Sequence, residues 1–440
     1  MDGAAAVPAQ VLIDEAHLER AAQKVKDDFS KAEIKIHRFP ASLRDVSGSD
    51  GRYVVPRAVS IGPYHHGARH LQDMEDVKRA AAYHFCRGSG RSLQAVYAEV
   101  LSVSAHARDC YAATGDEALR GTGEEDDGFA ALMFRDGCFL AQFMLADTHP
   151  RMVDPSLLCC FMSNLHSILR DIMLLENQIP WLILEALMPF APVPVVVGEF
   201  VATVAASFAI SCDVKRNQGP PFVMDGSYRP PHLLGLLRAY LLGSIVPPAE
   251  VDGAFDSSGI TTFSQSSSAI ELAQIGIKLT ASRTTQLRDM GIKKALFGGE
   301  LFLAPLVLDG LNACWLVNMV ALETCWPETG IVCSYVFLLA MLMNREEDVH
   351  ELRAKRILHG DLSDRHALDF IMNLVRPLCI PNHYALIQRQ LAAYKRKRWV
   401  WIAVHRFVYS NIKTIFMVLS IVGVLVGIFK TLLALPQKTS

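Results

Sequence analysis

The chain has 440 residues, of which 51% are hydrophobic and 20% are charged, and its formal net charge is −2. This composition excludes an intrinsically disordered protein and supplies enough apolar side chains for a large buried core. A net charge so close to zero gives no reason to expect a nucleic-acid-binding protein. The ten cysteines include no Cys-x-x-Cys pair, so neither a zinc ribbon nor a redox-active dithiol is indicated, and no cofactor is expected. We interpret them as buried free thiols in a reducing compartment.

Apolar residues at helical spacing dominate most of the chain. Residues 1–32 predict an amphipathic amino-terminal helix, and residues 33–393 predict a helical globular body. Stretches rich in acidic residues or in Pro, Gly and Ser predict loops near residues 115–128, 217–231 and 246–269. Within the body, residues 165–188 are expected to form one apolar helix that is kinked at Pro180, because proline has no N–H to donate.

Two short runs differ from this helical pattern. The sequences "IGIKLT" (275–280) and "ALFGGELFLAPLVLD" (295–309) contain alternation and β-branched residues, which indicate a small hairpin or sheet. The expected fold class is therefore mainly α, with a helical body, a small β element and one carboxy-terminal transmembrane helix.

The transmembrane helix is expected at residues 414–435, where Lys430 is the only charged residue. About 20 apolar residues span the hydrocarbon core of a bilayer. The rival interpretation is a buried core helix, but the 436–440 tail is too short to cover it. Residues 394–413 are expected to be a basic and aromatic juxtamembrane segment. Its interfacial residues are Lys395, Arg396, Lys397, Arg398, Trp399 and Trp401.

The distribution of basic residues around this stretch predicts that the body lies in the cytosol. The amino terminus turns acidic before any apolar run, so no secretory signal is expected there. The protein is thus expected to be single-pass, in either the plasma membrane or the endoplasmic reticulum.

Three motifs are candidates for a site. The first, "IGPYHHG", contains Pro63, Tyr64, His65, His66 and Gly67. The second, "RDGC", contains Asp136, Gly137 and Cys138, and the third, "ENQIP", contains Glu176, Asn177, Gln178 and Pro180. Adjacent side chains of an extended segment point to opposite faces, so the two histidines are not expected to share a metal. We expect them to fix the loop through hydrogen bonds to backbone groups.

The other two motifs interrupt apolar segments. Cys138 is followed by apolar residues, so its thiol is expected to be buried and structural. Glu176, Asn177 and Gln178 are expected to form a satisfied polar network that fixes the packing. A ligand pocket at this position is the alternative.

Several segments, in this order, resemble the plant-specific family known as domain of unknown function 247. The matching pieces include "IHRFP", "VVPRAVSIGPYHHG", "LQDMEDVKRA", "MFRDGCFL" and "DIMLLENQIPWLIL". Asn411 departs from the family pattern, because Ile412 and Lys413 follow it instead of Pro and Trp. The resemblance implies a largely helical, membrane-associated protein without an established catalytic activity. Some grass members of the family are linked to self-incompatibility.

These observations lead to two functional hypotheses. The favoured one is a non-catalytic recognition or signalling protein that acts through protein–protein contacts with an unidentified partner protein. Under this hypothesis the protein associates with a membrane and does not bind nucleic acid, and its oligomeric state is left open. The alternative is an orphan enzyme that uses His65 or His66 as an acid or base, with a pocket near Glu176.

Overall fold

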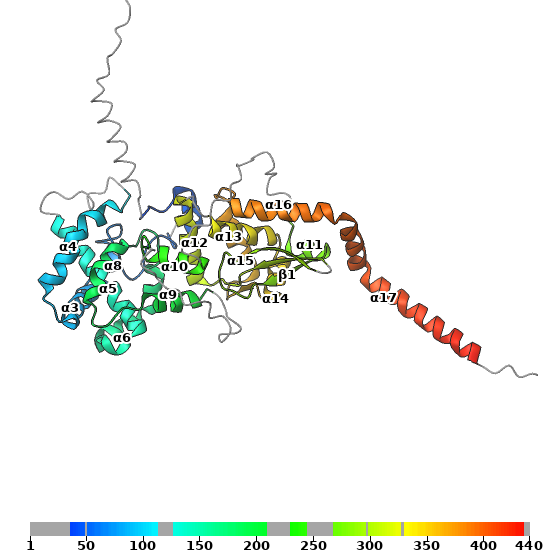
Figure 1. Ribbon diagram of the computed structural model, residues 1–440, viewed down its shortest axis with the longest axis horizontal. Coiled ribbons are helices and arrows are strands. Elements are labelled where there is room, and N and C mark those ends of the chain that lie inside the picture. Colours follow the sequence, from blue (N-terminus) through cyan, green and yellow to red (C-terminus); the bar gives the residue numbers. More distant parts are fainter. Residues whose placement is uncertain are drawn as a thin grey trace, which may run out of the picture. The chain divides into compact units, whose positions relative to one another are not determined.

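Figure 1 shows the computed structural model of the protein, which is mainly helical with two small sheets among the described residues. The structure describes residues 36–48, 51–112, 126–208, 229–243, 267–295, 298–326 and 330–434. The prediction of a mainly helical fold with a small β element is confirmed. The expected helix at 1–32, the tail at 436–440 and most of the three expected loops lie outside the described residues.

The chain divides into two compact units, each built from three separate segments. Unit 1 comprises residues 1–38, 60–160 and 176–195, and unit 2 comprises residues 39–59, 161–175 and 196–440.

The core of unit 1 forms around α5 (Asp126–Thr148), against which α3 (Gln72–Ser89), α4 (Leu93–Asp109) and α8 (Trp181–Leu187) pack. Helix α3 buries Met74, Ala81 and Phe85, which recur at helical spacing. It ends at Gly90, whose φ of +67° is the left-handed cap that glycine adopts readily. The remaining elements of unit 1 are η2 (Arg69–Leu71), η4 (Pro150–Met152), η5 (Met188–Phe190) and the first part of α6 (Pro155–Ser163).

Helix α5 is long and apolar enough, by length and composition, to cross a membrane. However, 89% of an 18-residue apolar window within Gly128–Thr148 is buried inside the protein. We therefore interpret α5 as the core helix of unit 1. By the same criteria of length and composition, Thr414–Ile428 is a shorter apolar helical stretch and is not classed as a candidate span.

The core of unit 2 forms around α13 (Ile331–Leu342), all of whose residues are buried. Helix α13 contacts α12 (Gly310–Cys325), α15 (Asp364–Val375) and α16 (Asn382–Lys397). Asp309 caps α12, because its side chain accepts the N–H groups of Leu311 and Asn312. Helix α13 is apolar on every side, as is expected of a helix at the centre of a core.

Two small sheets belong to unit 2. The three-stranded sheet has the order β1 (Ile277–Ala281), β3 (Gly298–Leu303), β2 (Gly291–Ala295). Strand β3 pairs in parallel with β1 and antiparallel with β2, with Ile277 opposite Gly299 and Gly291 opposite Phe302. Strands β4 (Leu306–Val307) and β5 (Leu358–His359) form a second, parallel pair. The sequence did not predict β2, because its "GIKKA" run carries two lysines and little alternation.

The other elements of unit 2 are helices and short turns. They are η1 (Ala41–Leu43), α2 (Arg44–Ser47), α7 (Leu165–Asp171), α9 (Val197–Ala206), α10 (Leu233–Leu242), α11 (Ala269–Gln274), α14 (Glu346–Ala354) and α17 (Trp399–Ala434). Helix α17 is the long orange-to-red helix at the end of the described chain (Figure 1). It begins at Trp399 and not at residue 414, so the expected 394–413 segment is divided between α16 and α17.

The expected single helix at 165–188 is wrong. Helix α7 ends at Asp171 and α8 begins at Trp181, while residues 172–180 form turns and irregular chain. Pro180 stands as the amino-terminal flanking residue of α8 and does not kink a continuous helix.

Candidate functional site

A buried ionic cluster joins α3 and α5 in unit 1. Lys78 Nζ lies 2.7 Å from Asp136 Oδ1 and 2.5 Å from Glu75 Oε1. The side chains of Lys78 and Asp136 are fully buried. Sequence reasoning singled out Asp136 but missed Lys78 and Glu75. The available signal was the position of Lys78 on the apolar face of α3, four residues after Met74, with Glu75 three residues before it.

The two carboxyl groups of this cluster are shifted in opposite directions. Burial raises the pKa of Asp136, and the charge and hydrogen bond of Lys78 offset this only in part. Burial also acts to raise the pKa of Glu75, but the hydrogen bond and charge of Lys78, with a hydrogen bond from Ser60, leave that pKa lowered. Glu75 is therefore the carboxyl group that ionises more readily.

The cluster binds the backbone of the "IGPYHHG" motif. The Gly62 N–H donates to Asp136 Oδ2 at 2.7 Å, and the Ile61 N–H donates to Asn177 Oδ1 at 2.7 Å. Lys78 Nζ donates to the carbonyl oxygen of Ser60 at 3.0 Å. These bonds satisfy backbone groups that would otherwise be buried without a partner.

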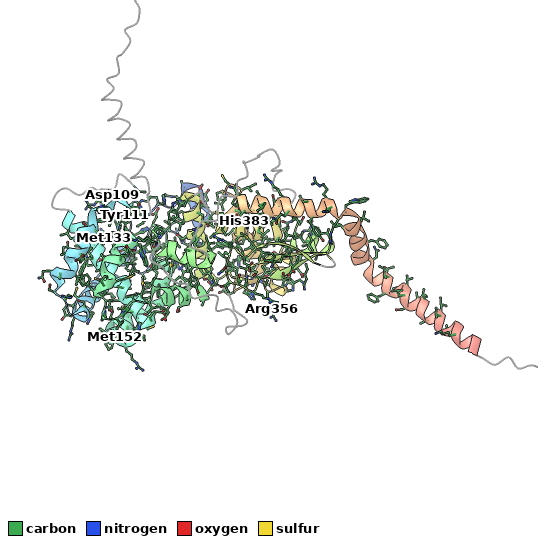
Figure 2. All side chains as sticks on the ribbon, viewed as in Figure 1. Asp109, Tyr111, Met133, Met152, Arg356 and His383 are labelled. Carbon is green, nitrogen blue, oxygen red and sulfur yellow. The ribbon has the colours of Figure 1, made fainter. Side chains whose placement is uncertain are left out.

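Gly62 fits this position because of its conformation and its surroundings. Its φ is +80°, and a Cβ atom there would lie 2.4 Å from the carbonyl oxygen of Gln178. That same carbonyl accepts the Tyr111 hydroxyl at 2.9 Å. Figure 2 labels Tyr111 close to Met133, whose sulfur lies 3.8 Å from the hydroxyl oxygen. Burial raises the pKa of Tyr111 well above its usual value, so the phenol stays protonated as a donor.

The residues just before this motif are bound in the same way within unit 2. Asp171 Oδ2 accepts three successive backbone N–H groups, those of Arg57 at 2.8 Å, Ala58 at 2.6 Å and Val59 at 3.1 Å. Its other oxygen, Oδ1, lies 2.6 Å from Arg170 Nη1. One carboxylate oxygen therefore fixes a bend of the chain, because successive N–H groups can converge on a single atom only where the backbone turns.

Asn318 of α12 connects two other backbone segments of unit 2. Its Oδ1 accepts the Leu175 N–H at 2.8 Å, and its Nδ2 donates to the Tyr53 carbonyl at 2.9 Å. Asn318 and Asp171 were not among the candidate residues. The Leu175 N–H thus bonds to a side chain instead of the helical carbonyl four residues earlier. This bond, together with Pro180, explains why the helix is interrupted between residues 172 and 180.

The two histidines differ from each other. Burial, Arg38 and His70, in that order, lower the pKa of His65 to about 4, so its imidazole is neutral at pH 7. His65 Nε2 lies 3.8 Å from Glu176 Oε2, which also lies 3.4 Å from Arg38 Nη1. Because the imidazole is neutral, the contact between His65 and Glu176 is not an ion pair.

His66, in contrast, is exposed. This contradicts the expectation that its ring satisfies a buried backbone group. Among the described residues, no group of three or more His, Cys, Asp and Glu side chains is placed to hold a metal ion.

The cysteines also differ from one another. Cys138 is fully buried on α5, and burial raises the pKa of its thiol well above the usual value. Its neighbour Gly137 packs closely on α8, since a Cβ there would lie 2.5 Å from Leu187 Cδ1. Cys159 is exposed, although its apolar sequence run favoured burial.

The geometry of these motifs is that of a scaffold. Asp136 and Asn177 bind backbone amides, and Gln178 offers its carbonyl to Tyr111. Groups used in this way hold the backbone of Ile61 and Gly62 in place.

Comparison with known proteins agrees with the resemblance of these motifs. A sequence profile for DUF247, described as a plant protein of unknown function, matches residues 36–426. The chain belongs to the DUF247 family. Every residue of the hydrogen-bond network described above lies within the range of the DUF247 match.

A relative with a curated name is the UPF0481 protein of Arabidopsis thaliana, which is 24% identical to this DUF247 protein over 334 residues. The aligned region covers 69% of this chain and 64% of the relative, so the chain spans less than two thirds of that protein's length. No solved structure is significantly similar to the chain.

Proposed function

We propose that this DUF247 protein is a single-pass, membrane-tethered plant protein whose helical body acts in recognition or signalling through protein–protein contacts, without catalysis. The observation that carries the proposal is the exposed apolar surface of α17. Its large apolar residues between Phe416 and Ile428 are between 49% and 65% exposed. They are Phe416, Met417, Val418, Leu419, Ile421, Val422, Val424, Leu425, Val426 and Ile428.

These residues are distributed over all sides of α17, because successive residues of a helix are rotated by about 100°. A helix that is apolar on every side is buried in a protein core or in a membrane. The body does not cover this stretch of α17, whereas it buries the comparably apolar α5. A lipid bilayer would supply the apolar surroundings that the body does not.

The non-catalytic part of the proposal is supported by how the motif residues are used. An acid or base that works at neutral pH needs a pKa near 7. His65 has a pKa of about 4, and Glu176 lies against Arg38. These features argue against that part of the alternative in which an orphan enzyme uses His65 next to a pocket at Glu176.

Fractionation of plant cells tests the tether. The full chain is expected in the membrane pellet after washing with sodium carbonate at high pH, and a variant lacking residues 414–440 is expected in the supernatant. Release of the full chain by carbonate would contradict the proposed tether.

Affinity purification from native tissue tests the recognition role. A protein that is retained in stoichiometric amount both by the full chain and by the variant lacking 414–440 is the expected result. Recovery of the bait alone would count against a role in protein–protein contacts.

We also propose that the body lies in the cytosol. Six basic residues precede the apolar stretch within a short distance, and two lie at or beyond its far end. The six are Lys395, Arg396, Lys397, Arg398, Arg406 and Lys413, and the two are Lys430 and Lys438. An excess of Lys and Arg marks the cytosolic side of a single span.

A further inference from the structure

The junction between α16 and α17 holds part of its charge against the body. Helix α16 ends at Lys397 and α17 begins at Trp399, so Arg398 alone connects them. Lys395 donates to the Ser267 hydroxyl. Arg398 donates to the Gly298 carbonyl at 3.4 Å and lies 5.5 Å from the centroid of the Tyr394 ring.

The remaining two basic side chains of the junction, Arg396 and Lys397, are exposed. They stand directly before an exposed apolar stripe. Trp399 is 70% exposed, Val400 55% and Phe407 63%. At about 100° per residue, these positions fall within roughly 100° of the helix circumference. The exposed Ala403 lies on the same stripe.

Helix α17 is too long for its full length to lie in hydrocarbon. Its 36 residues extend about 54 Å at 1.5 Å per residue. The hydrocarbon core of a bilayer is about 30 Å thick, which about 20 residues cross. The residues of α17 before Thr414 therefore need a second environment, outside the hydrocarbon core.

We propose that residues 399–407 lie against the headgroup region of the membrane and that Arg396 and Lys397 bind anionic phospholipid headgroups there. This inference rests on the proposed membrane tether. Exposed basic residues beside an apolar stripe that contains Trp and Phe match a surface that is anionic outside and apolar beneath. The stripe is continuous with the proposed span, so the bilayer is the partner that α17 places next to it.

The inference is tested with the full chain reconstituted into vesicles of phosphatidylcholine, with or without about one third phosphatidylserine. Bromine-labelled phosphatidylcholine quenches nearby tryptophan, and subtracting the Trp399→Phe signal from that of the wild type isolates Trp399. Quenching of Trp399 is expected to be stronger in the anionic vesicles. The double variant Arg396→Glu and Lys397→Glu is expected to abolish this increase.

The expected size of the effect follows from the charge. About 1 kcal/mol per basic residue near an anionic surface corresponds to roughly a fivefold change in equilibrium for each residue. A matched control carries Arg87→Glu and Arg91→Glu, two exposed residues of unit 1. This control changes the net charge equally and should leave the quenching of Trp399 unchanged.

A second measurement separates the inference from the tether. Resistance of the reconstituted wild type to carbonate in neutral vesicles reports the span itself. If the protein resists carbonate but Trp399 is quenched equally in both vesicle types, the headgroup proposal is overturned while the tether stands. The same holds if the control variant loses the increase in quenching as fully as the Arg396→Glu and Lys397→Glu variant. Loss of carbonate resistance would overturn both.

Discussion

At the scale of single residues, side chains take over the role that secondary structure usually has for the backbone. The segment from Arg57 to Gly62 donates five N–H groups to carboxylate and amide oxygens of Asp171, Asn177 and Asp136. The sequence indicated a polar network at 176–178, but not its partners. Asn177 and Ile61 are 116 residues apart, and local patterns carry no information about such a pairing.

Replacement of Asn177 by Leu tests the network. The substitution leaves the buried Ile61 N–H without its acceptor, so the free energy of unfolding is expected to fall by about 1–3 kcal/mol although apolar volume is added. Urea unfolding of the full chain in detergent measures the change. Asn373→Leu, at an exposed position of α15, is the control and should have little effect. Equal stability of the two variants would show that the Asn177 amide is dispensable.

The stability of the protein should depend on pH through His65. Its folded pKa of about 4 lies below the usual 6.5, so the unfolded chain binds a proton more readily than the folded chain between these values. The contribution of His65 to the free energy of unfolding is therefore fully present above pH 6.5 and is lost as the pH falls towards 4. The loss is about 2–3 kcal/mol in the wild type. Unfolding measured at pH 7 and pH 4 should show this loss greatly reduced in His65→Gln. The exposed His66→Gln should behave like the wild type, and an identical pH profile for all three proteins would contradict the assignment.

At the scale of elements, periodicity was informative for helices and less so for their interruptions. The apolar pattern predicted the helical class and the regions of three strands, β1, β3 and β4. It failed at residues 172–180, where the Leu175 N–H bonds to Asn318, 143 residues later in the sequence. It also placed the start of the last helix at residue 414, because hydropathy marks the point at which charged residues end. Helix α17 begins earlier, at Trp399.

The close approach of α5 to α8 can be tested with two glycines of one helix. A Cβ at Gly137 would lie 2.5 Å from Leu187 and 3.0 Å from Ile183, both fully buried, whereas Gly128 has open space around it. Gly137→Leu is therefore expected to lower the melting temperature strongly, since overpacking a dense core costs about 1–3 kcal/mol or more. Gly128→Leu should be neutral or slightly stabilising because of its better helix propensity. A similar melting temperature for both variants would mean that α5 and α8 are not in close contact.

At the scale of the whole molecule, each compact unit is assembled from three separate stretches of chain. Residues 39–59 belong to unit 2, although most of unit 2 follows residue 195. The chain passes from one unit to the other five times, at 38/39, 59/60, 160/161, 175/176 and 195/196. None of these points lies in the loops predicted near 115–128, 217–231 and 246–269, so the predicted loops did not indicate the division. Composition instead predicted one continuous body.

The proposed orientation predicts where glycosylation takes place. Sequons are engineered separately into the 121–128 segment and after Ser440, and each full chain is synthesised with microsomes. Only the appended site should gain a glycan, seen as an endoglycosidase-sensitive shift in mobility, because it would lie in the lumen. A glycan on the 121–128 site alone would reverse the orientation.

The hydrogen bond from Asn318 to the Tyr53 carbonyl has a consequence for biosynthesis. The two residues are 265 positions apart, and a ribosome adds about 5–20 residues per second. Tyr53 is therefore made roughly 13 to 50 seconds before its partner exists. Arg57, Ala58 and Val59 are likewise made before Asp171, whose side chain accepts their N–H groups. During that interval these backbone groups lack the side-chain partners that they have in the folded protein, so we expect this part of the nascent chain to need protection by a chaperone.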